Sequence, residues 1–469
     1  MEKALTAGQR ILKPPARGAQ NGELLAVDGM RILNRCRLTK IYVCGNPKLR
    51  AAALDAGNEL PWANVRSVPH EDLVAGRKIS DGHFVLLVDY QSSGFDDEEF
   101  RNNNPNAVVV LLAASRFIGS MPPREAEGAY PYVKKADFVF YFDDTENALG
   151  RVIPAAIRCA EDRINIEKYS VEKRFVFLVV DPEPRWFSQF LPALYRIIGQ
   201  RADVAIARTY EKAEEFMRLH GDKIVCLITD TQIPRAGAMG PHGRELASFA
   251  KSEYPRFPVI IASESEEAGT VRDTALVISR MDTDSLGRLE RCVRDFTGMG
   301  DFLVYDGNEL KARASTLAEL RDVVAKLQTE LLESIASHDY FSTWAYMHGF
   351  NELGDFLRPR QDRGEMLRDV LVRHIDNALL KAENERFEFK GEDGRVAATA
   401  GSARELAARI AEADISIIEL CSNTDAFSTW LMRKGHNGLA DDLRPLHGEG
   451  EALRRELLEI FARHGIIAQ

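Results

Sequence analysis

Short apolar runs alternate with polar segments of helical length before residue 300. A brief β-branched run is typical of a strand buried on both faces of a parallel sheet, and helix-length spacers between such runs are typical of βαβ units. The predicted strands are 40–44, 83–89, 107–113, 137–142, 175–180, 203–207, 223–229, 257–263 and 275–280. The pattern predicts two tandem doubly wound α/β domains.

In the second of these units the spacers predict helices at 186–198, 210–219, 243–252 and 285–296. The last has apolar residues at Leu286, Leu289, Val293 and Phe296, the spacing of an amphipathic helix with one buried stripe. A further helical segment, 146–168, is expected to join the two α/β units, with a kink or a late start at Pro154.

Beyond residue 300 the pattern changes to long helical stretches and an internal repeat. The segment 339–359 recurs as 425–445, with twelve of 21 positions identical at a constant offset of 86. Each copy follows a short strand-like piece with a Gly turn and a helix, which we expect at 317–334 and 403–421. Trp344 and Trp430 are predicted core anchors of a duplicated, mainly α-helical α+β module.

These patterns divide the 469 residues into five parts, enough for several domains of ordinary size. We expect an N-terminal arm at 1–38, α/β domains at 39–168 and 170–298, and repeats at 300–382 and 385–469.

Composition narrows the class of protein. The formal net charge of −10 argues against nucleic acid as a partner. The six cysteines show no paired spacing, which favours free thiols in a reducing compartment. No apolar run reaches membrane-spanning length and the first residues lack a signal peptide's apolar core, so we expect a cytoplasmic protein without membrane insertion.

Polar residues follow the predicted strands of the second α/β unit, at the edge where open α/β sheets collect ligands and chemistry. Asp181 follows the first strand, and Asp230 follows the third, with Pro234 four residues later. Ser263 ends the fourth strand and Arg280 the fifth. This ordered set resembles the receiver domains of bacterial response regulators.

The resemblance implies roles for these residues. Asp230 would be the phosphoacceptor, an in-line nucleophile, and Ser263 the switch hydroxyl. Asp181, Glu183 and Asp230 would hold magnesium, the one candidate cofactor, and a histidine kinase would be a candidate partner.

Two departures leave another interpretation open. Pro182 stands where receivers usually have a second metal-binding acid. Arg280 stands in place of the phosphate-contacting Lys, and its planar guanidinium is not equivalent to an ammonium. Asp230 and Arg280 could instead form a structural ion pair that mimics one fixed state.

The first α/β unit has receiver-like spacing but little of the chemistry. Its first strand ends in Gly45-Asn46, Asp89 has no Pro four residues later, and no Lys follows the fifth strand. We expect a degenerate receiver that serves packing or partner binding.

The repeat also offers two interpretations. Asp339 and Asp425 are predicted helix caps or first-turn acids, and Gly349 and Gly435 predicted helix ends. Alternatively, the equivalently placed Arg358 and Arg444 contact an anion such as phosphate or carboxylate.

The run 178–188 together with the Phe-Ser-x-Trp repeat is similar to the regulatory region of bacterial phosphoenolpyruvate/pyruvate-binding domain proteins. This similarity covers 172–359 and the second motif copy at 425–445, and does not extend to the catalytic part. It implies a regulatory module separate from its enzyme.

These observations predict a non-enzymatic bacterial signalling adaptor that acts through protein–protein contacts, with phosphorylation of Asp230 as its candidate switch. One alternative is a constitutive scaffold or assembly protein whose receivers are inactive and whose repeats form a homo-oligomer. A further alternative is a sensor of a small anionic metabolite that uses Arg358 and Arg444.

Overall fold

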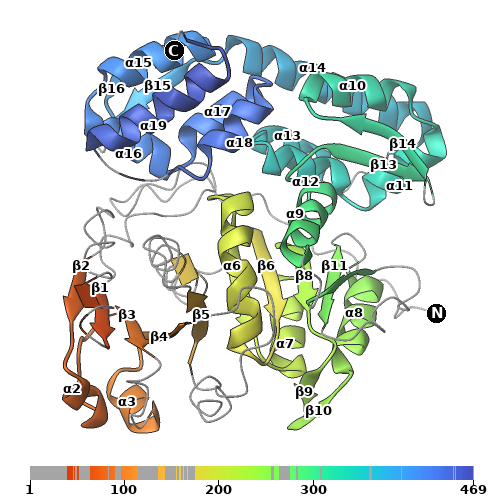
Figure 1. Cartoon of the computed structure of the whole chain (residues 1–469). Helices are drawn as coiled ribbons and strands as arrows, with labels where there is room; N and C mark the ends of the chain where they lie inside the picture. The colour runs from red at the N-terminus through yellow and green to blue at the C-terminus, as the bar shows by residue number, and fades with distance from the viewer. Residues whose placement is uncertain are drawn as a thin grey trace.

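The computed structural model describes thirteen segments of the chain and a few isolated positions. The segments are 40–45, 64–82, 84–89, 97–114, 136–142, 175–254, 258–263, 275–280, 284–306, 309–358, 362–391, 393–446 and 450–467. The predicted N-terminal arm and Pro154 lie outside the described residues. Figure 1 shows two α/β regions beneath a helical C-terminal region.

The first α/β region is a five-stranded parallel sheet with the order β2-β1-β3-β4-β5. Its strands are β1 (Lys40–Cys44), β2 (Asn64–Ser67), β3 (Phe84–Asp89), β4 (Ala107–Ala114) and β5 (Phe138–Phe142), with helices α2 (His70–Val74) and α3 (Asp97–Asn103). The sequence pattern missed β2, because this short edge strand carries mostly polar residues.

The second α/β region is also a five-stranded parallel sheet, with the order β12-β11-β8-β6-β7. Its strands are β6 (Phe175–Val180), β7 (Ala202–Ala207), β8 (Ile224–Thr229), β11 (Val259–Ser263) and β12 (Ala275–Ser279). Its helices are α6 (Pro184–Ile198), α7 (Tyr210–His220), α8 (His242–Glu253) and α9 (Ser285–Phe296). Numbered along the chain within each region, both sheets have the order 2-1-3-4-5.

A small antiparallel hairpin follows β8, and the sequence pattern did not predict it. It consists of β9 (Ile233–Arg235) and β10 (Ala238–Gly240), joined by Ala236 and Gly237. Both turn residues have positive φ, +50° and +80°, as a two-residue hairpin turn requires.

The two α/β regions share helix α6. One side of α6 covers its own sheet, and β5 of the first sheet packs along the helix. The backbone N–H of Val139 donates to Ser188 Oγ at 3.0 Å, and the rings of Phe138 and Phe187 meet edge to face at 5.9 Å. One hydrophobic cluster therefore contains buried residues of both sheets.

The predicted connecting helix is described at a few positions, all of them helical, and two of these act on the second sheet. Asp162 accepts a hydrogen bond from the backbone N–H of Val204 in the edge strand β7 at 3.0 Å. Arg158 pairs with Asp162 and donates to the carbonyl of Ala202 at 2.8 Å. These contacts satisfy backbone groups that an uncovered edge strand would expose.

The C-terminal region contains two copies of one unit, which we call repeat 1 (residues 300–382) and repeat 2 (residues 385–469). Repeat 1 contains β13 (Phe302–Asp306), β14 (Glu309–Ala314), α10 (Leu317–Lys326), α11 (Thr329–Ser337), α12 (Tyr340–Met347), α13 (Asn351–Leu357) and α14 (Gly364–Asn384). Repeat 2 contains β15 (Phe387–Lys390), β16 (Val396–Ala400), α15 (Ala403–Glu412), α16 (Ile415–Asn423), α17 (Ala426–Arg433), α18 (Asn437–Leu443) and α19 (Gly450–Arg463). Corresponding helices start 86 residues apart, as the sequence offset predicted.

Each long helix that we expected before the motif is in fact two helices, so that expectation was wrong. Repeat 1 breaks between α10 and α11, and repeat 2 between α15 and α16. In repeat 2 the cause is visible, because the side chain of Asp414 caps α16 by accepting from the backbone N–H of Ser416 at 2.9 Å.

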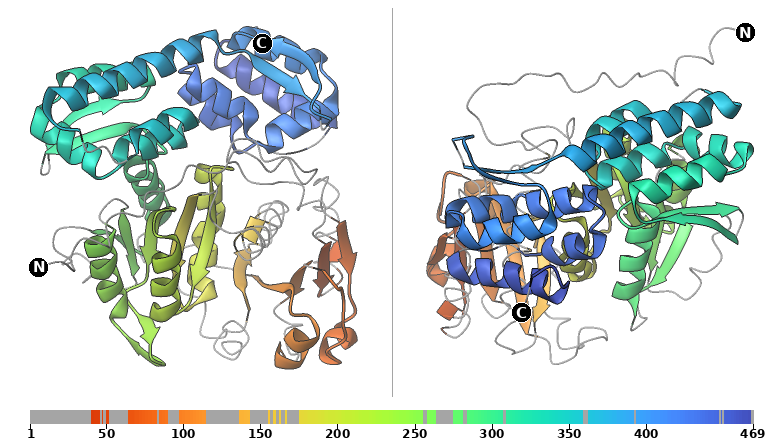
Figure 2. Two further views of the ribbon diagram at one scale, coloured as in Figure 1. Left: turned by 180° about the vertical axis from the view of Figure 1, so that it is seen from behind. Right: turned by 90° about the horizontal axis from the view of Figure 1, so that it is seen from above.

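Among the described residues, no helix is both long and apolar enough to span a membrane. Two of the views in Figures 1 and 2 show both repeats on the same side of the α/β part of the molecule. The contacts described below place them at the amino-terminal ends of β6 and β7, opposite the strand ends that carry the candidate chemistry.

Candidate functional site

The four residues expected to form the site do lie at the carboxyl ends of neighbouring strands. Asp181 follows β6, Asp230 follows β8, Ser263 is the last residue of β11, and Arg280 follows β12. Parallel strands bring these ends to one edge of the sheet, so the fold places together four residues that are up to a hundred positions apart.

Arg280 bridges the two aspartates. Its Nη2 lies 2.5 Å from Oδ2 of Asp181, and its Nη1 lies 3.5 Å from Oδ2 of Asp230. The side chain of Arg280 is 9% exposed, that of Asp181 2% and that of Asp230 14%. The guanidinium is therefore largely withdrawn from water and offsets part of the charge of the two carboxylates.

The electrostatic balance at Asp181 explains why this cation is needed. Burial raises the pKa of Asp181 to about 6, Arg280 opposes that rise, and the charge of Asp230 adds to it. The backbone N–H of Glu183 donates to Oδ1 of Asp181 at 2.8 Å and further stabilises the carboxylate. Without a cation nearby, two neighbouring carboxylates would oppose each other's ionisation.

Ser263 makes a contact that the sequence analysis did not include. Its Oγ lies 2.8 Å from Oγ1 of Thr231, and both side chains are buried. Thr231 follows Asp230 directly in the sequence. A hydroxyl residue next to the acid at the end of a strand could therefore have identified Thr231 as part of the site. Trp186 of α6 also borders the site, with the Arg280 guanidinium 5.7 Å from its ring centroid.

The positions of the three predicted magnesium ligands can be compared at this edge. The described residues include no group of three or more His, Cys, Asp or Glu side chains that could hold a metal ion. Of the three predicted magnesium ligands, Asp181 and Asp230 contact Arg280, and Glu183 is the residue before α6.

In the first α/β region, the corresponding strand ends carry Gly45 after β1 and Asp89 at the end of β3. The side chain of Asp89 and the segment after β5 lie outside the described residues. The degenerate character of this region therefore stays a prediction from sequence.

The repeat tryptophans occupy equivalent core positions. Trp344 and Trp430 are each 1% exposed and belong to the hydrophobic clusters of repeats 1 and 2. Gly349 and Gly435 follow α12 and α17 with φ of +78° and +82°, as expected of glycines that end a helix.

Asp339 and Asp425 immediately precede α12 and α17, but they do not cap them through their side chains. Both adopt the left-handed conformation, with φ of +63° and +57°, which is uncommon for residues other than glycine. The carboxylate of Asp339 accepts from Ser342 Oγ, and that of Asp425 accepts from the backbone N–H of Gln200 at 2.7 Å. The expected capping role is corrected accordingly.

Arg358 and Arg444 both lie where the repeats meet the second α/β region. The Arg358 guanidinium lies 4.9 Å from the ring centroid of Tyr346 and 5.8 Å from that of Phe175, the first residue of β6. Arg444 is 2% exposed, and its Nη1 lies 3.6 Å from Oδ2 of Asp425.

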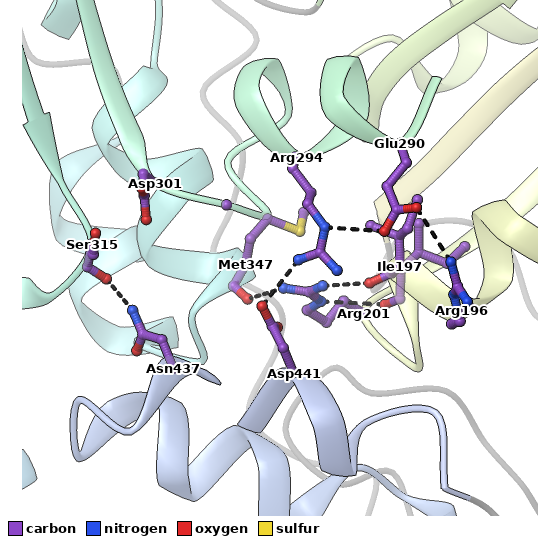
Figure 3. Close-up of polar contacts among 12 residues, drawn as sticks. Arg196, Ile197, Arg201, Glu290, Arg294, Asp301, Ser315, Met347, Asn437 and Asp441 are labelled. Carbon is purple, nitrogen blue, oxygen red and sulfur yellow. Dashed lines mark hydrogen bonds and ion pairs between the residues drawn. The ribbon is translucent and has the colours of Figure 1, made fainter. Parts of the chain in front are cut away.

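Figure 3 shows the polar contacts around this junction. Arg201 donates to the carbonyls of Ile197 at 2.6 Å and of Met347 at 3.1 Å, and so ties α6 to the end of α12. Arg294 of α9 donates to Asp441 of repeat 2 at 3.0 Å. The sequence analysis missed Arg201 and Arg294, because nothing in their local sequence sets them apart from surface cations.

Comparisons of the chain with protein-family models and with curated proteins found no match.

Proposed function

We propose that this protein is a signalling scaffold whose second α/β domain is a receiver-like unit held in one state by Arg280. Its output is protein–protein contact through the α/β regions and the C-terminal repeats. This is the constitutive alternative from the sequence analysis, and it now has more support than the phosphorylation switch.

The observation that carries the proposal is the bridge from Arg280 to Asp181 and Asp230. Its guanidinium lies between the two carboxylates that a receiver would use for its metal and its phosphoryl group. The strand order 2-1-3-4-5, which is that of flavodoxin-like doubly wound sheets, supports the receiver-like assignment.

Phosphorylation of Asp230 would require a divalent cation at the site as well as access of the phosphate donor to the carboxylate. A receiver needs a divalent cation to neutralise the charge on the transferring phosphoryl oxygens. Here the two aspartates already have a cation, held within the fold by a 2.5 Å contact to a buried carboxylate. Removing it would break a buried ion pair, which is costly because one charge is left without its partner.

The test is treatment of the full chain with acetyl phosphate and magnesium, followed by a phosphate-affinity gel. We expect no mobility shift in the wild type. A magnesium-dependent shift that disappears in Asp230→Asn would overturn the proposal and restore the switch.

Arg280→Lys is the informative second variant in that experiment, because it retains the charge and removes the planar bridge between the aspartates. Acquired phosphorylation in this variant, with none in the wild type, would identify the guanidinium as the block.

Self-association is part of the scaffold proposal. Light scattering coupled to size-exclusion chromatography, run over a range of protein concentrations, tests it. A mass equal to one chain throughout would remove the homo-oligomer and leave a scaffold for other proteins.

A further inference from the structure

Repeat 1 is anchored to the second α/β region by apolar contacts. Met347, at the end of α12, belongs to the same hydrophobic cluster as Phe177 and Met299. The ring of Tyr346 lies 5.1 Å from that of Phe175, the first residue of β6. Contacts of this kind bury apolar surface and make a stable attachment.

In repeat 2 a cation stands where repeat 1 has the anchor residue Met347, whereas the counterpart of Tyr346 is Met432. At the offset of 86, Arg433 corresponds to Met347 and Lys434 to His348. Arg433 pairs with Glu385 at 2.5 Å, and Lys434 donates to the carbonyl of Glu383 at 2.9 Å. The hydrophobic cluster of repeat 2 contains residues of repeat 2 alone among those described.

Repeat 2 instead contacts the second α/β region through a buried polar cluster, which we call the clasp: Gly199, Gln200, Asp425 and Arg444. Asp425 accepts from the Gln200 N–H and pairs with Arg444. The aliphatic part of Arg444 lies against Gly199, where an added Cβ would approach Arg444 Cγ to 2.8 Å and Asp425 Oδ2 to 2.3 Å.

The clasp contains buried polar atoms that lack hydrogen bonds within the described part of the chain, and Arg358 Nε at the equivalent position of repeat 1 lacks one too. Among the described residues, Arg444 Nε and Nη1 and Gln200 Oε1 are buried without a hydrogen-bond partner. Buried polar atoms without a hydrogen bond are unfavourable, and so is a left-handed backbone, which Asp425 shares with Asp339 of repeat 1. By contrast, Arg201 donates to three backbone carbonyls, including that of Met347 in repeat 1.

We propose that repeat 2 is a releasable arm, with repeat 1 as its fixed base and the clasp as the contact that opens. Release would uncover Gly199 and Gln200 between α6 and β7, together with Arg294 of α9. This conformational device does not depend on whether Asp230 is phosphorylated.

Native-state hydrogen exchange on the full chain tests the proposal. In the wild type, we expect the Gln200 amide to exchange through a local opening. Its exchange rate should therefore depend less on denaturant concentration than the rates of amides in the core of β8. Asp425→Asn keeps a side chain that tolerates the left-handed backbone but removes the charge from the acceptor. We expect about tenfold faster exchange at Gln200 in this variant, since a charge-assisted hydrogen bond is about twice as strong as a neutral one.

Asp339→Asn is the matched control, because Asp339 occupies the equivalent left-handed position and bonds Ser342 within repeat 1. It should leave Gln200 exchange unchanged. Core amides of α19 should also keep their protection in Asp425→Asn, which separates release of repeat 2 from its unfolding.

Salt provides an independent measurement. The Arg294–Asp441 pair, which joins α9 to repeat 2, is partly exposed, so added salt weakens it by screening. Exchange at Gln200 should accelerate with ionic strength, whereas exchange in β8 should not. If Gln200 exchanges with the same denaturant dependence as β8 in the wild type, repeat 2 belongs to the same cooperative unit and the proposal fails.

Discussion

The guanidinium of Arg280 lies 2.5 Å from the buried carboxylate of Asp181 and also reaches Asp230. One cation thus serves two acids that come from neighbouring strands. The chain itself therefore supplies the positive charge beside the two acids at this edge of the sheet.

Arg280→Ala should be strongly destabilising, because it leaves Asp181 buried without its partner. We expect a loss of about 3 kcal/mol in the free energy of unfolding, the lower end of the range for breaking a buried ion pair. Magnesium should partly restore stability in this variant, since the aspartates become available to another cation. Thermal unfolding with and without magnesium chloride measures both effects.

Arg291→Ala is the control for that experiment. Arg291 pairs with Asp284, and both side chains are more than half exposed, so its removal should leave the free energy of unfolding nearly unchanged. Equal effects of the two substitutions would show that the Arg280 bridge contributes no more than a surface pair.

His348 should make the junction sensitive to acid. Burial, together with the charges of Arg201 and Arg444, lowers the pKa of His348 to about 3. The unfolded chain therefore binds more protons than the folded chain between pH 6.5 and pH 3, and stability falls as the pH is lowered through that window. The free energy of unfolding of His348→Gln, measured relative to that of the wild type, should therefore be about 2 kcal/mol higher at pH 5 than at pH 6.5.

Urea unfolding of both proteins at those two pH values is the measurement. A difference that stays constant with pH would mean that His348 is protonated in the folded state as readily as in the unfolded chain. In that case the imidazole that stacks on Trp344, with ring centroids 3.9 Å apart, would be protonated in the folded protein.

Gly243→Ala should disturb the backbone at Asp230. An added Cβ at Gly243 would lie 1.7 Å from the carbonyl oxygen of Asp230, so α8 or the end of β8 must shift. Overpacking of this kind costs about 1–3 kcal/mol. Gly82→Ala is the control, because nothing lies within 4 Å of the added atom, and chemical denaturation compares the two.

The duplicated tryptophans allow an internal comparison. The indole N–H of Trp344 donates to Gly300, whereas that of Trp430 is buried without a partner among the described residues. Replacing either by Phe removes similar apolar volume, so Trp344→Phe should cost about 1 kcal/mol more than Trp430→Phe. Equal losses in denaturant titrations would mean that the bond to Gly300 contributes no net stability.

Much of the second α/β region was predictable, because its strands are continuous apolar runs and its helices alternate with them. The pattern placed α6, α7, α8 and α9 to within two residues of their observed ends. It failed at β2 and at the hairpin of β9 and β10, where short strands carry little apolar signal. It also failed at the breaks between α10 and α11 and between α15 and α16, which depend on local backbone geometry.

The candidate site was predictable as a set of residues but not as an arrangement. Strand ends indicated that Asp181, Asp230, Ser263 and Arg280 would meet. Whether Arg280 would point at the acids or at a phosphate is decided by distances of a few ångströms, which no spacing in the chain encodes. The contacts between repeat 2 and the second α/β region were even harder to predict. Asp425 and Gln200 are 225 positions apart, and Asp425 accepts from a backbone N–H, which carries no sequence signal.

The helix shared by the two sheets has a practical consequence for dissecting the protein. Phe187 and Ser188 of α6 meet Phe138 and Val139 of β5, so a fragment cut between the α/β regions would expose an apolar strip of α6 to water. Such a fragment is prone to aggregate, and its behaviour would reflect the new surface instead of the native domain. Proteolytic or genetic boundaries should therefore leave both sheets on one polypeptide.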